Sequence, residues 1–192
     1  MRSEGNRLKA GQILHQFTAQ DGTQVILRTL KWEDLDDLLD VINTLIEESA
    51  EIEYDTHMTR DAEADWLVST LANFEKDKVL PVVAEVKGKV IASSSISTKG
   101  FTCEKHVGNL GILIRSGYRD RGIGTEMMKT LMEQARLMNL KVLTLSVFAT
   151  NKRAIHVYEK VGFKEAGRIR KGIYRKGEYI DRIIMTKDLV ED

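Results

Sequence analysis

One strand–helix–strand unit, at residues 107–148, constrains the fold of this chain more than any other feature. Residues 107–115 and 142–148 are apolar and rich in β-branched side chains, which predicts two strands. Between them, apolar residues at spacings of three and four predict a helix over residues 122–138. A helix that connects two strands of one sheet makes them parallel, with a right-handed crossover. The chain therefore has to build a sheet that is at least partly parallel.

The remaining segments predict that this sheet is mixed. Two β-branched runs separated by Lys87-Gly88-Lys89 favour an antiparallel hairpin. We expect an α/β fold with a central six- or seven-stranded mixed sheet flanked by about four helices. The other predicted strands are residues 13–17, 24–30, 79–86, 90–98, 163–170 and 178–186, and the other predicted helices are residues 32–49, 59–74 and 151–161. Side chains expected in the core include Trp32, Trp66, Met127, Met128, Met132 and Met138.

Composition narrows the class of protein. The 192 residues contain no Gly/Ser- or Pro-rich linker, so we expect a flexible arm over residues 1–12 and a single domain over residues 13–192. Lys plus Arg equals Asp plus Glu, 29 each, which argues against nucleic acid or an anionic membrane as partner. Cys103 is the only cysteine, so no internal disulfide can form. With no signal-like apolar stretch, a cytoplasmic location is expected.

The segment Arg119-Asp120-Arg121-Gly122-Ile123-Gly124-Thr125 carries the first chemical signal. It joins a predicted strand to a predicted helix, and glycines at a helix start let a ligand approach the unpaired N–H groups of the first turn. A phosphate group is the expected ligand, although a glycine-rich turn without a ligand would look the same. Met127 breaks the dinucleotide-binding pattern, and no Gly-Lys-Ser/Thr follows as in a P-loop.

A second motif covers residues 151–163. Asn151 is a suitable helix N-cap, Ala154 permits close approach, and Tyr158 lies one turn further along the same helix face. Gly162 is a suitable helix terminator. Each of these features also occurs in helices without function, so the order of the two motifs is more specific than either motif alone.

Together, the two motifs resemble those of the GNAT superfamily of acetyl-CoA-dependent N-acetyltransferases. The resemblance extends from about residue 24 to 188 and includes the strand end Gly111-Ile112-Leu113-Ile114. It implies the acyl-CoA N-acyltransferase fold, acetyl-CoA as cosubstrate without a metal, and pantetheine in a gap between the strands of residues 107–115 and 142–148. By resemblance, the cofactor-binding residues are Ile112, Leu113, Ile114, Arg119, Asp120, Arg121, Gly122, Ile123, Gly124, Thr125, Asn151 and Tyr158.

The resemblance also implies a mechanism in which a primary amine of a small molecule or a peptide or protein N-terminus attacks acetyl-CoA directly. A backbone N–H near Leu113 would stabilise the tetrahedral oxyanion. Tyr158 would be the general acid for the leaving thiolate, because a tyrosine of ordinary pKa about 10 is protonated at pH 7. Cys103 is expected to be a packing or surface thiol rather than a nucleophile.

The base that deprotonates the amine is the weakest part of the resemblance. Ser146 and Asn109 occupy positions where relatives carry carboxylates. A water relay or one of Glu47, Glu48, Glu51, Glu53 and Glu85 remains as an alternative, and the acidic stretch of residues 46–60 would suit a cationic acceptor. Because a base is missing, a catalytically weak acetyl-CoA sensor or interaction module is the main alternative function. A nucleotide-binding domain and a homodimer are further possibilities.

Overall fold

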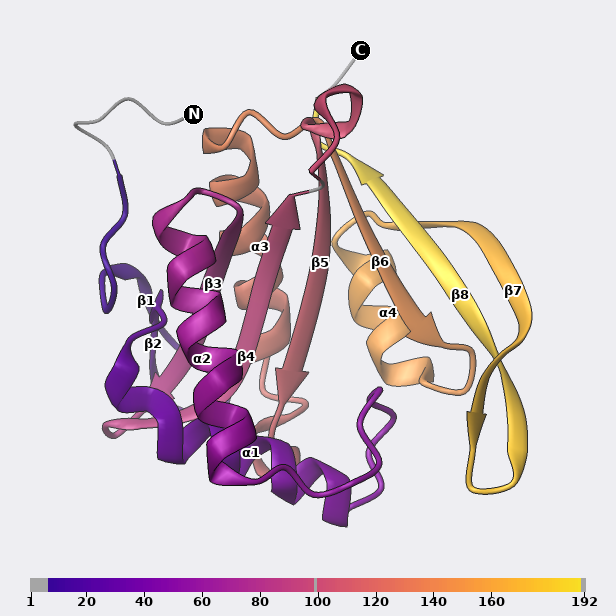
Figure 1. The fold of residues 1–192 in the computed structure, drawn as a ribbon, viewed down its shortest axis with the longest axis horizontal. Helices are drawn as coiled ribbons and strands as arrows, with labels where there is room; N and C mark the ends of the chain where they lie inside the picture. The colour runs from indigo at the N-terminus through magenta and orange to yellow at the C-terminus, as the bar shows by residue number, and fades with distance from the viewer. Residues whose placement is uncertain (1–6, 99, 191–192) are drawn as a thin grey trace.

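The computed structural model describes residues 7–98 and 100–190 of the chain (Figure 1). Four α-helices and eight strands form most of this part. In chain order the elements are β1 (Ile13–Thr18), β2 (Gln24–Thr29), η2 (Trp32–Asp34), α1 (Leu35–Glu47), α2 (Arg60–Glu75), β3 (Val79–Val86), β4 (Lys89–Thr98), η3 (Thr102–Glu104), β5 (Val107–Ile114), η4 (Ser116–Tyr118), α3 (Ile123–Leu137), β6 (Val142–Phe148), α4 (Lys152–Lys160), β7 (Lys164–Arg175) and β8 (Glu178–Asp188). Every predicted helix and strand is present, with bounds that differ by a few residues.

All eight strands belong to one mixed sheet in the order β1-β2-β3-β4-β5-β6-β8-β7. The strand count of six or seven was therefore too low. The N-terminal β1–β2 hairpin joins the sheet because Ile26–Thr29 of β2 pair with Val82–Glu85 of β3. Only β5 and β6 are parallel among the pairs of this sheet, as the crossover through α3 predicted.

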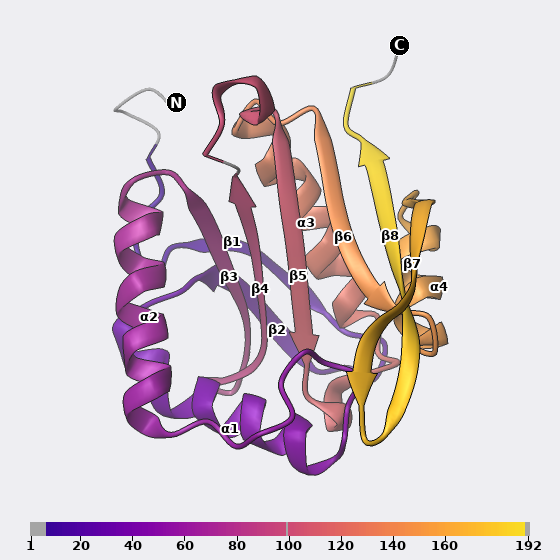
Figure 2. The same cartoon turned by 45° about the vertical axis from the view of Figure 1, so that its right-hand side comes forward.

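Helices cover both faces of the sheet, α1 and α2 on one side and α3 and α4 on the other (Figures 1 and 2). The larger core lies against α3, whose Met127, Met128 and Leu131 are fully buried. A smaller core packs α1 and α2 on the sheet through residues such as Leu38 and Leu67. The methionines are thus core residues, as expected. The tryptophans are not, because Trp32 is 49% and Trp66 37% exposed.

Strands β5 and β6 pair only at their beginnings. The parallel register runs from Val107–Val142 to Asn109–Thr144 and then stops, and the strands diverge beyond it (Figure 2). Gly108 lies in the paired part, where a Cβ atom would approach Ile96 Cγ2 and Leu140 Cδ1 to 2.8 Å. Glycine is required there because the core closes tightly just before the strands separate.

The β7–β8 hairpin is irregular and reaches over the sheet. Its register shifts between Ile169 and Ile173, where Lys171 has a φ of 54° and donates its N–H to Asp181 Oδ1 at 2.9 Å. A bulge increases the local twist of a hairpin, and beyond it the two strands cross and extend toward the loop between α1 and α2 (Figures 1 and 2). Lys176 and Arg175 at the hairpin end donate hydrogen bonds to Ser49 Oγ and to the Ala50 carbonyl.

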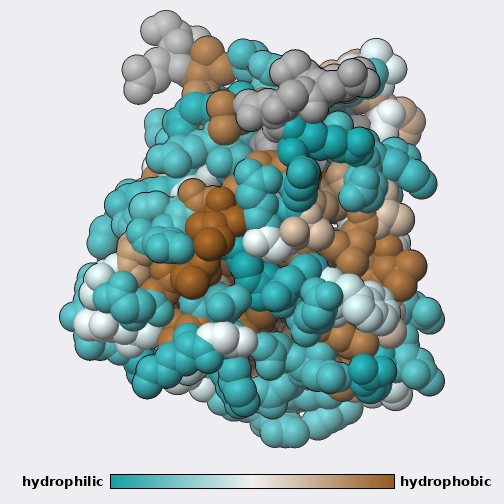
Figure 3. Space-filling view, turned by 90° about the vertical axis from the view of Figure 1, so that its left-hand side faces the viewer, coloured by the Kyte–Doolittle hydropathy of each residue, from teal (hydrophilic) through white to brown (hydrophobic). Residues whose placement is uncertain are grey.

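The division into an arm and one domain stays a prediction. Residues 1–6 of the expected arm lie outside the described residues. Leu8 packs against the larger core, and the carbonyl of Lys9 accepts a hydrogen bond from Thr29 Oγ1 at 2.5 Å. The surface seen from the left-hand side of Figure 1 is largely hydrophilic, with small separate apolar patches (Figure 3). Among the described residues, no helix is long and apolar enough to cross a bilayer.

Candidate active site

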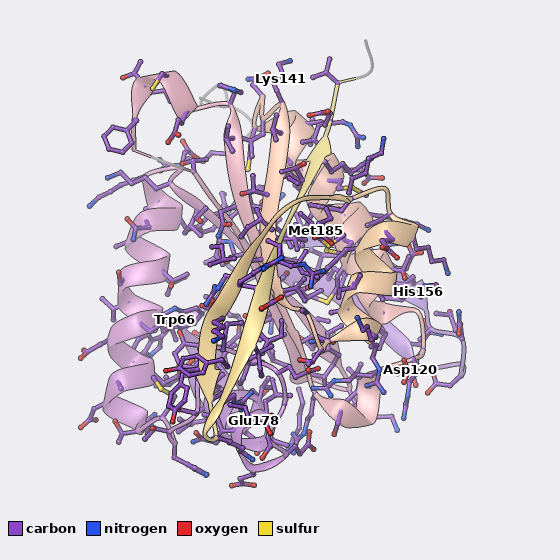
Figure 4. All side chains as sticks on the ribbon, turned by 90° about the vertical axis from the view of Figure 1, so that its right-hand side faces the viewer. Trp66, Asp120, Lys141, His156, Glu178 and Met185 are labelled. Atoms are coloured by element: carbon purple, nitrogen blue, oxygen red, sulfur yellow. The ribbon has the colours of Figure 1, made fainter. Side chains whose placement is uncertain are left out.

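A cleft of about 1160 Å³ opens where β5 and β6 separate. One part, which we call the cofactor half, lies at the N-terminal ends of α3 and α4 and includes Ile112, Ile114, Arg119, Gly122, Gly124 and Tyr158. The other, the acceptor half, lies between the α1–α2 loop, α2 and the sheet and includes Glu53, Trp66, Ser95, Leu113, Phe148 and Arg182. Figure 4 shows the β7–β8 hairpin between Trp66 on α2 and His156 on α4. The two halves are continuous.

The sequence-predicted site residues converge on this cleft. Those that line it are Ile112, Leu113, Ile114, Arg119, Asp120, Gly122, Gly124, Thr125, Asn151 and Tyr158. The two others lie beside it. Ile123 is 1% exposed and packs in the larger core, and Arg121 lines an adjoining hollow of about 640 Å³.

The hydrogen-bond phase of β5 determines which backbone groups face the gap. Arg115 donates its N–H to the Ile91 carbonyl at 3.1 Å, and the β4–β5 register is regular. Because backbone bonds alternate along an antiparallel pair, Leu113 bonds to Ser93 of β4, while Ile112 and Ile114 point their groups away from β4. Beyond Asn109 there is no ladder with β6 to engage them. The donor expected near Leu113 is therefore on Ile112 or Ile114.

The loop before α3 has the backbone shape of an anion site. Asp120 and Gly122 are both left-handed, with φ of 59° and 84°, and Gly122 is the helix N-cap without a side-chain capping bond. The N–H groups of Ile123, Gly124 and Thr125 therefore begin the helix without a capping side chain. Such groups, together with the helix dipole, favour an anion.

Side chains around this loop are tied to neighbouring elements. Arg119 donates from Nε to the Ile114 carbonyl at 2.8 Å, and burial, followed by the nearby Arg153, lowers its pKa from the ordinary value. Arg121 pairs with Asp21 of the β1–β2 turn and lies over the Tyr118 ring. These contacts hold the loop in place and leave its N–H groups and excess positive charge for a ligand.

Helix α4 begins differently and carries Tyr158. Asn151 caps its own helix by accepting the Ala154 N–H at 3.1 Å, so its side-chain oxygen is occupied and its NH₂ group remains as a donor. Tyr158 lies two turns along and is 7% exposed. Its hydroxyl makes no hydrogen bond to a described residue, and burial raises its pKa to about 12. The phenol therefore stays protonated at any physiological pH.

The carboxylates considered as bases are not equivalent in the structure. Glu85 pairs with Arg28, which also forms a buried bidentate pair with Asp34. Arg28 on β2 and Asp34 on η2 are buried. None of these three residues lines the cleft. Glu85 is thereby a structural residue.

Three carboxylates of the acidic stretch have contacts, but only Glu53 pairs with an arginine. Glu47 is 3.6 Å from His57 Nε2, Glu48 accepts from Ser116 Oγ at 2.6 Å, and Glu53 pairs with Arg182. Glu51 and Glu53 line the cleft, so they remain as candidate bases, and which group acts stays a prediction. Ser146 and Asn109 also line it, with Asn109 Oδ1 accepting from Thr144 Oγ1 at 3.4 Å.

Sequence reasoning missed several lining residues. The sequence could have indicated Arg182, because a charged residue between Ile180 and Ile184 on one face of a predicted strand is unusual. Gln20 lines the cleft beside Gly122 and donates its backbone N–H to the Arg121 carbonyl at 3.0 Å, which no local pattern predicts. Other missed residues are Tyr54, Ser93, Ser95, Phe148, Ile173 and, as a lining rather than a core residue, Trp66.

Cysteine and metal chemistry are the remaining possibilities to consider. Cys103 is exposed on η3, which precedes β5 and so stands at the opposite end of that strand from the gap (Figure 1). Within residues 7–98 and 100–190, no group of three or more His, Cys, Asp or Glu side chains could hold a metal ion.

An eight-stranded sheet with one splayed parallel pair, an open helix start and a buried phenol fits a CoA-dependent acyltransferase. Residues 35–163 match the model of the acetyltransferase (GNAT) family, and the chain belongs to that family. It is an N-acetyltransferase whose cosubstrate is acetyl-CoA.

The chain is similar to several known proteins. It is 29% identical to the L-amino acid N-acetyltransferase AaaT of Escherichia coli K12 over 59% of this chain and 70% of that protein. The structure of ribosomal-protein-alanine N-acetyltransferase from Brucella melitensis superposes with a TM-score of 0.75 at 27% identity, covering 84% and 98% of the two chains. The phosphinothricin acetyltransferase of Sinorhizobium meliloti in complex with acetyl-CoA has a TM-score of 0.76 at 17% identity, covering 90% and 89%.

Proposed function

We propose that acetyl-CoA lies in the cofactor half and that a primary amine in the acceptor half attacks its thioester directly. The observation that supports this proposal is the gap between β5 and β6. The backbone groups of Ile112 and the N–H of Ile114 lie free along it, which suits the amides of pantetheine, while the Ile114 carbonyl accepts from Arg119. The N–H groups before and within the first turn of α3 lie at its end. Pyrophosphate then binds residues 119–125, and the Asn151 NH₂ group donates to the pantetheine arm.

The adjoining hollow continues this site. It is lined by Arg121, Lys129 and Lys160, and shares Gln20, Gly122 and Thr125 with the cleft. Glu126 pairs with Lys129 at 2.7 Å and Asp21 pairs with Arg121, which leaves Lys160 as the excess positive charge of the hollow. An adenosine end that carries phosphate fits a space of this charge.

The reaction balances without a covalent enzyme intermediate. The ammonium form of the acceptor loses one proton to water or to a carboxylate, and its nitrogen attacks the thioester carbonyl carbon. The N–H of Ile112 or Ile114 donates to the oxyanion. As the C–S bond breaks, the nitrogen loses a second proton and Tyr158 protonates the departing sulfur. Tyr158 then recovers its proton, so the products are the amide, CoA-SH and one proton.

The acceptor is a primary amine of a small molecule or of a peptide or protein N-terminus. The relatives are named for both kinds, an amino acid in one case and a ribosomal-protein alanine in another. Both kinds present an amine to the same thioester, so the named relatives alone do not decide between them.

A thiol-release assay tests the proposal. The protein is incubated with acetyl-CoA and separate pools of amino acids, polyamines, aminoglycosides and peptide N-termini, and free CoA-SH is followed. Cys103→Ser is the matched control, because the exposed thiol would also react with the reagent. We expect amine-dependent release in both proteins and no acetyl-protein by intact mass. CoA binding without release by any amine would instead favour an acetyl-CoA sensor.

A further inference from the structure

Arg182 occupies the floor of the acceptor half. It lies on β8 directly opposite Phe148 of β6, so the two side chains share the face of the sheet that bears Ser146. Nη1 donates to Ser146 Oγ at 3.2 Å and to Glu53 Oε1. The side chain is 27% exposed and lines the cleft. A cation therefore stands beside the gap, on the acceptor side of the proposed thioester position.

The guanidinium group of Arg182 is only partly used. Nε and Nη2 make no hydrogen bond or ion pair to any residue in the part of the chain that the structure describes. These two nitrogens lie on one edge of the planar group, and that edge matches the two oxygens of a carboxylate. The unused donors thus form a ready bidentate site for an anion.

The charges around Arg182 oppose a polycationic acceptor. Glu53 pairs with Arg182 itself, whereas Glu47 contacts His57 and Glu48 accepts a hydrogen bond from the Ser116 hydroxyl. A second guanidinium, that of Arg175, lies 5.9 Å from the Phe148 ring centre. A polyamine in the cleft would meet Arg182 in addition to Glu51 and Glu53. Of the acidic stretch that favoured a cationic acceptor in the sequence, Glu51 and Glu53 line the cleft, and Glu53 is paired with Arg182.

An α-amino acid carries a carboxylate that matches the free edge of Arg182 and, one carbon away, the amine that is acetylated. Its carboxylate carbon and amine nitrogen are joined through one carbon and lie about 2.5 Å apart. A carboxylate on the free edge of Arg182 therefore fixes the position of the amine, on the side of the guanidinium group away from Nη1 and Glu53. The side chain then meets the apolar part of this half, formed by Tyr54, Trp66 and Phe148.

We propose that the acceptor is a free α-amino acid or a close analogue, bound by Arg182 through its carboxylate. This rests on the proposed function, and it excludes acceptors whose carboxyl group is blocked or absent. A site built around a charged hydrogen-bonding group rejects an analogue that leaves this group unpaired.

Matched acceptors test the proposal with the intact protein. We would measure kcat/KM for phenylalanine, phenylalaninamide, phenethylamine and spermidine, and for the corresponding leucine series. In the unaltered protein, at least one free amino acid should exceed its amide by 10-fold or more. Arg182→Ala should lower kcat/KM for the amino acid 10- to 100-fold through KM, without lowering that of the amide. Arg182→Lys, which keeps the charge but loses the planar edge, should restore only part of kcat/KM for the amino acid.

Controls distinguish a failure of the proposed carboxylate site from a failure of the proposed acetyltransferase function. Arg170→Ala removes an exposed arginine on β7 that does not line the cleft and should change neither value. Calorimetry should show unchanged CoA binding in Arg182→Ala. Amides, simple amines or spermidine that match or exceed the amino acids in the unaltered protein would overturn the carboxylate site and leave the acetyltransferase function standing. Failure to bind CoA or to acetylate any acceptor would overturn both.

Discussion

The two halves of the cleft are built from different materials. The cofactor half consists mainly of backbone: the free edge of β5 and the uncapped start of α3, both set by short local motifs. The acceptor half consists of side chains from the α1–α2 loop, α2, β4, β5, β6, β7 and β8. Backbone binding suits a ligand that is the same for the whole family. Side-chain binding lets each chain choose its own acceptor.

This difference predicts where substitutions act. A change in the cofactor half should affect every acceptor equally, whereas a change in the acceptor half should affect some acceptors and leave CoA binding intact. A cofactor-half variant that affects only some acceptors, or an acceptor-half variant that weakens CoA binding, would contradict this difference.

The largest effect is expected from Gly124→Val. The residue needs no left-handed backbone, and its Cβ atom would lie 3.1 Å from Ile114 Cδ1, a side-chain end that can shift. The protein should therefore fold, while the branched side chain covers the N–H groups that hold pyrophosphate. Calorimetry should show no detectable CoA binding. Gly167→Val, at a strand position with open space, is the control. Unchanged affinity in folded Gly124→Val would remove the pyrophosphate assignment.

Tyr158→Phe should give the next largest effect, on kcat alone. Since the hydroxyl has no partner among the described residues, its removal leaves the fold intact, and acetyl-CoA affinity should change little. Loss of the general acid should lower kcat roughly 10²- to 10⁴-fold for every acceptor. Tyr174→Phe, on the exposed hairpin, should be neutral. Full kcat in Tyr158→Phe, with chemistry limiting, would exclude the tyrosine as the acid.

The smallest effect is a shift in pH dependence. Tyr158 must be protonated to act, and burial raises its pKa to about 12, so it causes no loss of rate below about pH 10. The rising limb of kcat/KM should then follow deprotonation of the acceptor amine. Ser146→Glu should move this limb to lower pH.

The same variant should raise the acceptor KM, because the new carboxylate would compete for Arg182. The measurement is a pH–rate profile of both proteins at saturating acetyl-CoA. A flat profile from pH 6 to 9 in the unaltered protein would show that an efficient base is already present, and Glu51→Gln and Glu53→Gln would locate it.

The same division separates what the sequence could predict from what it could not. Strand and helix positions, the parallel crossover and the glycine loop follow from local patterns, and each is present. The environment of a residue that is set by tertiary contacts could not be predicted from these local patterns. Trp66 has helical spacing with core residues, but the α1–α2 loop and the hairpin leave it at the cleft rim.

The acidic stretch shows the same limit in terms of charge. In the sequence, residues 46–60 appear as a free negative surface. In the fold, Arg182, Lys176 and Arg175 arrive from more than 120 residues away and bind Glu53, Ser49 and the Ala50 carbonyl. A local charge pattern cannot show which partners a distant hairpin will bring.

The central claim is that acetyl-CoA lies along the gap between β5 and β6, and amide hydrogen exchange followed by ¹⁵N NMR tests it at single residues. Adding CoA should slow exchange at Ile112 or Ile114 and at Gly124, whose N–H groups are free for a ligand. The amide of Leu113, already bonded to β4, should change little by comparison. Bound CoA that leaves Ile112, Ile114 and Gly124 unprotected would contradict this placement.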